Sequence, residues 1–371
     1  MQIGVPREIY PGEARVAMVP NDVARLVKLG AAVQVESGLG AAIRLSDAEY
    51  EKAGATIAAD RHTLLAGSDI VARLRKPAAE EIALLRPGAV HISYLDPFNE
   101  KALLERLAAQ GVQAIAMELI PRTTRAQKMD ALSSQASLAG YAAVILAAER
   151  TDRVIPMMTT PAGTINPARI FIVGAGVAGL QAIATAKRLG ARVDAFDTRP
   201  TVAEQVKSLG ARFLEINLGE TGQTKDGYAQ ALTEDQLRLQ REAMAKQCAI
   251  SDIVITTAQV FGRKAPIIIT KEMVAGMRAG SIVVDLAIES GGNVEGAVLG
   301  QETDVNGVNI IGLENMPGRV AVHASQMYSA NLYNLLEDFW NKEKKTLELD
   351  PEDEILQGCL ITRDGKITRQ L

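Results

Sequence analysis

Short apolar runs alternate with longer segments of helical periodicity along most of the chain. This alternation predicts parallel β-sheets with helices on both faces. The predicted strands before residue 130 are 2–5, 32–36, 70–74, 89–93 and 113–116, and those after it are 170–173, 192–196, 253–256, 281–285 and 308–311. Each block of strands therefore predicts one doubly wound, Rossmann-like sheet.

Two long helices are predicted where the blocks meet. Residues 132–149 lead out of the first block, and residues 324–341 follow the last strand of the second. We expect an α/β protein with two doubly wound (Rossmann-like) domains that flank a cleft and are joined by these helices. The first domain would comprise residues 1–131 and 324–371, and the second would comprise residues 132–323. The length of 371 residues favours two domains over one.

The most specific motif is a glycine-rich turn after the strand 170–173. It reads Gly174-Ala-Gly-Val-Ala-Gly179 and opens a helical segment that closes at Gly190. Gly174 would form the tight turn, Gly176 would let the backbone approach a pyrophosphate, and Gly179 would allow close helix–strand packing. The helix N-terminus would add free N–H groups and the positive end of its dipole. The structural alternative is an ordinary tight turn between strand and helix.

Asp197 follows the next predicted strand, where dinucleotide-binding units carry an acid. A carboxylate there accepts the ribose hydroxyls and repels a 2′-phosphate, which favours NAD(H) over NADP(H). Arg199 weakens this preference, because a nearby arginine can accommodate a 2′-phosphate. The sequence therefore predicts a dinucleotide site in the second domain, with NAD(H) as the favoured cofactor.

A polar segment, residues 121–134, lies between the last strand of the first block and the connecting helix. In a doubly wound sheet this position is the carboxyl edge of the strands, where ligands bind. Arg122, Gln127, Asp130 and Ser133 offer donors and acceptors suited to a nicotinamide carboxamide. The alternative is a solvated loop between domains in which Asp130 caps the following helix.

Two further features are candidates for function. The glycine-rich segment 219–229 interrupts a βα unit, so we expect either a functional lid or disorder, and Tyr228 is its natural anchor on a bound nucleotide. Asp285 and Glu289 stand at and after the strand 281–285. They would serve either as a base beside the nucleotide or as structural acids.

Composition excludes several classes of protein. A net charge of −4 argues against a nucleic-acid partner. Two distant cysteines fit a reducing compartment, and the three histidines lack ligand spacing, so we expect no metal. We expect no signal peptide at the N-terminus, and the longest apolar stretch, 136–148, is shorter than a membrane span.

With these motifs the chain resembles the soluble NAD(H)-binding first component of proton-translocating transhydrogenase, a member of the alanine dehydrogenase superfamily. The segments that carry the resemblance are 6–8, 13–20, 125–135, 174–179, 262–266 and 315–325. It implies that Arg122, Gln127 and Asp130 orient the nicotinamide, that Ser133 assists, and that Tyr228 lies on a mobile loop. The expected nucleotide contacts are Gly174, Gly176, Val177, Ala178, Gly179, Asp197, Thr198, Arg199, Tyr228 and Ala258.

Departures from alanine dehydrogenase distinguish the two relatives. Arg15 matches the arginine with which that enzyme binds pyruvate, but Arg75 stands at its lysine position and Asp96 at its histidine position. Glu289 replaces an aspartate. Hydride transfer to a second nicotinamide needs no proton at the reacting carbon, so loss of these acid–base groups is expected of a transhydrogenase.

The resemblance therefore implies a subunit that passes hydride between NADH and NADP⁺, with NADP(H) bound as co-substrate on a partner subunit, and coupled to proton translocation. Membrane-spanning and NADP(H)-binding partner subunits are expected, with this chain on the cytoplasmic face of the inner membrane as a homodimer. One alternative is a stand-alone, alanine-dehydrogenase-like enzyme acting on a small keto acid. Another is a nucleotide-sensing module without catalysis.

Overall fold

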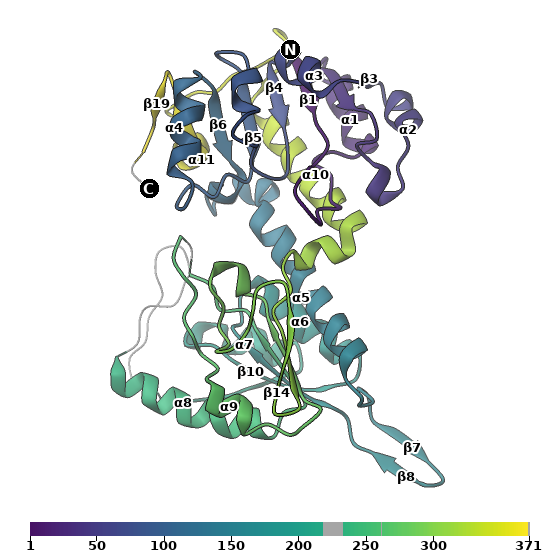
Figure 1. The fold of residues 1–371 in the computed structure, drawn as a ribbon, viewed down its shortest axis with the longest axis vertical. Helices are drawn as coiled ribbons and strands as arrows, with labels where there is room; N and C mark the ends of the chain where they lie inside the picture. The colour runs from purple at the N-terminus through teal and green to yellow at the C-terminus, as the bar shows by residue number, and fades with distance from the viewer. Residues whose placement is uncertain (218–232, 261, 370–371) are drawn as a thin grey trace. The chain divides into compact units, whose positions relative to one another are not determined.

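A computed structural model describes residues 1–217, 233–260 and 262–369. The chain divides into two compact units, drawn in Figure 1. The first unit contains Met1–Gln135 and Val320–Leu371, and the second contains Ala136–Arg319. Helix α5 (Ala131–Arg150) begins in the first unit and ends in the second.

The sheet of the first unit has the strand order β19-β18-β6-β5-β4-β1-β2-β3. Strands β1 to β6 are parallel, and the two strands from the C-terminal tail add antiparallel pairs at one edge. The strand order reverses direction between β1 and β4, which is the switch point where α/β sheets bind ligands. The strands are β1 (Gln2–Val5), β2 (Ala32–Glu36), β3 (Thr56–Ala58), β4 (Ile70–Ala72), β5 (Val90–Ser93), β6 (Gln113–Ala116), β18 (Leu360–Arg363) and β19 (Lys366–Ile367).

Helices of the first unit follow or connect these strands. They are α1 (Pro20–Lys28), α2 (Asp47–Lys52), α3 (Arg61–Gly67), α4 (Lys101–Ala109), α10 (Ala321–Asp338) and α11 (Glu354–Cys359). Short 3₁₀ helices include η1 (Ala41–Ile43), η2 (Ile82–Leu84), η3 (Met117–Leu119) and η4 (Ala126–Met129). A small ribbon, β16 (Trp340–Asn341) with β17 (Thr346–Leu347), follows α10.

The sheet of the second unit has the order β11-β10-β9-β12-β13-β15-β14. All its pairs are parallel except β14 with β15, and its switch point lies between β9 and β12. The strands are β9 (Arg169–Val173), β10 (Arg192–Phe196), β11 (Arg212–Phe213), β12 (Ile253–Thr256), β13 (Ile282–Asp285), β14 (Glu302–Val305) and β15 (Val308–Ile311). The helices are α6 (Val177–Arg188), α7 (Ala203–Ser208), α8 (Glu234–Ala249) and α9 (Lys271–Ala275), with η5 (Pro200–Val202), η6 (Ile288–Ser290) and η7 (Met316–Val320) as 3₁₀ turns.

Strand β9 shows why apolar runs mark central strands of the second unit. Ile170 and Ile172 pack into the core on one face of the sheet. Phe171 and Val173 pack into a separate core on the other face. Because both faces are covered, every residue from 170 to 173 is apolar instead of alternating. The prediction of an α/β protein with two doubly wound sheets is confirmed.

Some element ends differ from the prediction for local reasons. The strand predicted at 70–74 ends at Ala72, and beyond it the backbone N–H groups of Leu74 and Arg75 donate to the Glu8 carboxylate (2.7 and 3.3 Å) instead of to a neighbouring strand. Helix α5 is also longer than the apolar stretch within it. By length and composition α5 is long and apolar enough to cross a membrane, and 44% of its most apolar 18-residue stretch is buried inside the protein.

Candidate functional site

The glycine turn after β9 forms at the switch point of the second unit. Gly174 has a φ of 95°, a conformation that favours glycine, and an added Cβ would lie 2.5 Å from Thr257 Oγ1. A Cβ on Gly179 would lie 1.8 Å from the Gly174 carbonyl oxygen. A Cβ on Gly176 would meet no atom of the described residues within 4 Å. The fold therefore requires Gly174 and Gly179, whereas the space over Gly176 is open to an approaching ligand.

Helix α6 begins directly after Gly176. Its first turn has no acidic residue, and no side chain of the described residues caps its N-terminal N–H groups. Val177 is exposed and Ala178 is half-buried. Uncapped amides and the positive end of the helix dipole together form a site suited to an anion such as a pyrophosphate.

Asp197 lies at the carboxyl end of β10, beside this turn. One carboxylate oxygen accepts the N–H of Ala175 (2.8 Å), and the other accepts the N–H of Arg199 (2.9 Å). The guanidinium of Arg199 also donates to this carboxylate. Thr198 between them is half-buried. The structure thus brings Asp197 to the glycine turn, as a ribose-binding acid would require.

The loop after β12 completes this edge of the sheet. Thr257 donates its hydroxyl to the carbonyl groups of Val173 (3.2 Å) and Gly174 (3.1 Å). Ala258 donates its N–H to Asn293 Oδ1 (3.0 Å) and accepts from Asn293 Nδ2 (2.8 Å). Sequence reasoning missed Thr257 and Asn293, because neither belongs to a local motif.

Asp285 has a structural arrangement at the end of β13. Its carboxylate accepts N–H groups from Ala287 (2.9 Å), Asn293 (2.7 Å) and Val294 (3.0 Å), and the hydroxyl of Thr256 (3.1 Å). Burial raises the pKa of this carboxyl although these hydrogen bonds oppose the shift. All of these donors belong to the protein, so the Asp285 carboxylate holds the loop that follows β13 in place. Glu289 is exposed.

The polar segment of the first unit contains η4 and the start of α5. Asp130 accepts the backbone N–H of Ser133 (2.9 Å) and its hydroxyl (2.6 Å). Asp130 thus caps helix α5, which is the alternative role that the sequence analysis gives for this residue. Arg122 and Gln127 are exposed. The structure brings Asp130 and Ser133 into contact, with Gln127 on the preceding 3₁₀ turn.

Arg125 fixes this segment on the helices of the first unit. Its guanidinium pairs with Asp338, at the end of α10, and with Asp353, the N-cap of α11 (2.6 Å each). Lys128 adds a second contact with Asp338 (3.2 Å). Tyr228 lies outside the described residues, as does the whole segment 219–229.

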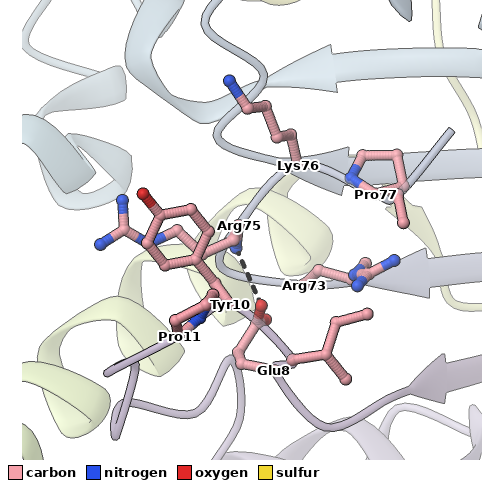
Figure 2. Close-up of a pocket in the computed structure, with 9 residues that line it drawn as sticks. Glu8, Tyr10, Pro11, Arg73, Arg75, Lys76 and Pro77 are labelled. Atoms are coloured by element: carbon pink, nitrogen blue, oxygen red, sulfur yellow. Dashed lines mark hydrogen bonds between the residues drawn. The ribbon is translucent and has the colours of Figure 1, made fainter.

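A pocket of about 260 Å³ lies at the switch point of the first unit, between the loops after β1 and β4 (Figure 2). Glu8 lies on its wall, and burial raises the pKa of this carboxyl despite the charge of Arg73. The cationic side chains of the pocket all have carboxylate partners. The pairs are Arg73 with Glu81, Arg75 with Glu13 (2.7 Å) and Lys76 with Glu100 (2.6 Å).

Arg15 lies in a buried ion pair in the same unit. Its guanidinium donates twice to Glu13 (2.8 and 2.6 Å) and once to Gln135 (2.8 Å). Burial alone would raise the pKa of Glu13, but hydrogen bonds and charge from Arg15, with the charge of Arg75, hold it at about 2. Arg15 and Arg75 therefore share one carboxylate of the protein.

No group of three or more potential metal ligands occurs within the described ranges. Cys248 and Cys359 are buried free thiols, and burial raises the pKa of each to about 12. Burial also lowers the pKa of His91 to about 3.

Two doubly wound sheets, one with a glycine turn opening a helix and an acid after the next strand, define a two-domain α/β protein of the dinucleotide-binding class. The family model for the alanine dehydrogenase/PNT N-terminal domain matches residues 4–139, and that for the C-terminal domain matches residues 143–370. The chain belongs to the alanine dehydrogenase/PNT family.

Within this family the likeness to transhydrogenases is the stronger one. The chain is 45% identical over 374 residues to the first part of NAD(P) transhydrogenase subunit alpha of Rhodospirillum rubrum, covering 99% of this chain and 97% of that protein. The structure of transhydrogenase from Sinorhizobium meliloti matches with a TM-score of 0.89 and 45% identity, over 99% of this chain and 100% of that one. Alanine dehydrogenase of Halomonas elongata is 30% identical over 379 residues, covering 99% and 95%.

Proposed function

We propose that this chain is the NAD(H)-binding, catalytic subunit of a Re/Si-specific, proton-translocating NAD(P)⁺ transhydrogenase. It transfers hydride between its own NADH and NADP⁺ bound on a partner subunit. The nicotinamide nucleotides supply the hydride chemistry, and the chain binds and orients one of them. The observation that carries the proposal is the open space over Gly176 at the start of an uncapped helix, in a chain that resembles transhydrogenase alpha subunits over nearly its whole length.

The proposed nucleotide site runs along the carboxyl edge of the second unit's sheet. The backbone at Gly174, Gly176, Val177, Ala178 and Gly179 would hold the pyrophosphate, and Asp197 with Thr198 and Arg199 would face the adenosine ribose. Ala258, fixed by Asn293 at the neighbouring strand end, supports the same edge. Tyr228, in the glycine-rich segment 219–229, is proposed to contact the nucleotide as well.

The proposed nicotinamide site uses the segment between β6 and α5. Arg122 and Gln127 are exposed polar side chains there, and Asp130 forms two hydrogen bonds with Ser133. A carboxamide needs one donor and one acceptor held in fixed positions. Orientation is the main contribution asked of these residues, because placing two rings at about 3–3.5 Å supplies much of the rate.

The proposed partners are membrane-spanning and NADP(H)-binding transhydrogenase subunits, with this chain on the cytoplasmic face of the inner membrane. The name of the R. rubrum relative, which denotes only one portion of subunit alpha, supports a division of the enzyme among several chains. A homodimer is supported by the hairpin β7 (Met158–Thr160) and β8 (Gly163–Ile165), whose strand residues are all exposed.

A stand-alone amino-acid dehydrogenase is the alternative function. It would need Arg15 and the residue at position 75 for the carboxylate of a keto acid. Both arginines already pair with Glu13, and Asp96 stands where that enzyme has a catalytic histidine. These contacts favour transhydrogenation.

Paired glycine variants test the nucleotide site. Gly176→Val fills open space, so we expect the fold and melting temperature to be kept while NADH binding is lost. Gly179→Val forces a contact with the Gly174 carbonyl, so we expect loss of the second unit's stability. Isothermal titration with NADH and thermal unfolding of both variants provide the measurement. Unimpaired NADH binding by Gly176→Val would reject the pyrophosphate site.

A further inference from the structure

Asp197 and Arg199 form a bidentate ion pair at the end of β10. Nε of Arg199 donates to one carboxylate oxygen of Asp197 (2.9 Å), and Nη2 donates to the other (2.7 Å). The side chain of Asp197 is 6% exposed and that of Arg199 is 17% exposed. A bidentate pair of this geometry is stronger and more precisely oriented than a single contact.

Local backbone geometry holds this pair in place. The N–H of Arg199 donates to the carboxylate two residues before it, and the N–H of Ala175 donates from the glycine turn. Two backbone and two guanidinium N–H groups thus fill about as many sites as the two oxygens of Asp197 offer. Any further group that approaches Asp197 must compete with the guanidinium of Arg199.

We propose that Asp197 and Arg199 act together as a pair that makes the site select NAD(H), which lacks a 2′-phosphate, over NADP(H), which carries one. Asp197 holds the guanidinium of Arg199, so that this cation does not serve as a ligand for a 2′-phosphate. Ribose hydroxyls are donors and can take the place of one guanidinium contact on the carboxylate while the other contact keeps Arg199 bound, whereas a 2′-phosphate is repelled by Asp197 and finds Arg199 already bound. The inference rests on the proposed function, since it assumes that the nucleotide's adenosine ribose lies at Asp197.

The paired arrangement differs from simple charge repulsion in one respect. If Asp197 acted only by repelling a 2′-phosphate, removing its charge would help NADPH whether or not Arg199 were present. If Asp197 also holds Arg199, the same substitution releases a guanidinium beside the position of the 2′-phosphate. The gain in NADPH affinity then depends on Arg199.

Three variants separate the two possibilities. Asp197→Asn removes the charge but keeps an oxygen that can accept the N–H of Ala175. Asp197→Asn with Arg199→Ala removes the released guanidinium as well. Asp197→Asn with Arg192→Ala is the matched control, because Arg192 is an exposed arginine at the opposite end of the same strand. Isothermal titration with NADH and with NADPH gives both affinities for each variant.

We expect Asp197→Asn to shift the ratio of NADPH to NADH affinity toward NADPH by about 100-fold, from lost repulsion and a new guanidinium–phosphate contact. Adding Arg199→Ala should remove at least about tenfold of that shift, whereas adding Arg192→Ala should leave it unchanged. Thermal unfolding verifies that each variant is folded. If Asp197→Asn does not fold, Asp197→Ser keeps a hydroxyl acceptor and replaces it in all three variants.

Two results would overturn the inference. One is a shift toward NADPH that persists in full without Arg199, which would leave repulsion alone as the cause. The other is no shift in Asp197→Asn. Failure of the proposed NAD(H) site gives a different result, because the unaltered chain would then bind no NADH.

Discussion

The two oxygens of Glu118 meet different surroundings after β6. Oε1 accepts the backbone N–H groups of Leu95 (2.8 Å) and Asp96 (2.6 Å) and so fixes the turn after β5, where Asp96 has a φ of 53°. Oε2 is buried and has no hydrogen-bond partner in the described part of the chain. Burial raises the pKa of Glu118 to about 7, against the opposing effect of these N–H donors.

This shift predicts a pH dependence of stability in the first unit. The folded carboxyl has a pKa of about 7, above its ordinary value of 4.5, so the folded state binds more protons between these pH values. The stabilisation that the protonated Glu118 carboxyl gives to the folded state is complete below pH 4.5 and is lost as the pH rises through 7. Glu118→Gln should remove roughly 2–3 kcal/mol of this variation. Denaturant unfolding of both proteins from pH 4.5 to about 8 measures it, and parallel curves would contradict it.

The roles of single residues could be predicted from the sequence where the backbone geometry leaves no room for a side chain. Gly174 and Gly179 belong to a motif whose spacing defines their positions, and the structure gives each a contact that excludes a side chain. Asn293 and Thr257 could not be predicted, because they act on segments distant in sequence. The roles of Gln127 and Asp130 toward a nicotinamide stay predictions.

At the scale of elements, Gly140 controls the approach of two helices in the second unit. An added Cβ on this residue of α5 would lie 2.1 Å from the carbonyl oxygen of Ala178, in the first turn of α6. The helices therefore contact each other through backbone at this point. The same turn of α6 carries the proposed pyrophosphate site, so we expect NADH binding to depend on this helix contact.

We expect Gly140→Ala to destabilise the second unit by about 1–3 kcal/mol through overpacking, and to weaken NADH binding as α6 is displaced. Gly67→Ala is the matched control, since Gly67 ends α3 and its nearest neighbour would be Gln2 Nε2 at 3.8 Å. That variant should be neutral, or more stable by up to about 1 kcal/mol. Thermal unfolding and NADH titration provide the comparison. Equal stability of the two variants would refute the close approach.

Central strands could be predicted because their apolar runs are buried on both sides of a sheet. Strands β1, β2, β6, β10, β12 and β15 have the predicted bounds. The prediction missed β3, β14 and the hairpin β7–β8, which are short and largely polar or exposed. It also missed β18, whose antiparallel addition to β6 depends on a contact between segments far apart in the sequence.

At the scale of the whole molecule, the hairpin β7–β8 is the strongest candidate for contact with a second copy. Figure 1 shows it projecting from the second unit. Met157, Met158 and Ile165 are 65%, 43% and 46% exposed. A two-stranded hairpin is marginally stable alone in water, so exposed apolar side chains on it favour packing against a partner.

We expect Met157→Asp combined with Ile165→Asp to convert the proposed homodimer into a monomer. Leu299→Asp is the matched control, because Leu299 is 52% exposed elsewhere in the second unit. Size-exclusion chromatography with light scattering measures the mass of each variant. A dimer that persists in the hairpin variant, or that is lost equally in the control, would contradict a hairpin-mediated contact.

The central claim is that hydride passes from NADH on this chain to NADP⁺ on a partner subunit. The most direct test mixes the chain with an NADP⁺-loaded partner and follows a single turnover with NADH deuterated at the transferable C4 position. We expect deuterium in the NADPH product, and no NADH oxidation when the isolated chain is given pyruvate and ammonia. Robust NADH oxidation with pyruvate and ammonia, and no deuterium in NADPH, would contradict the claim.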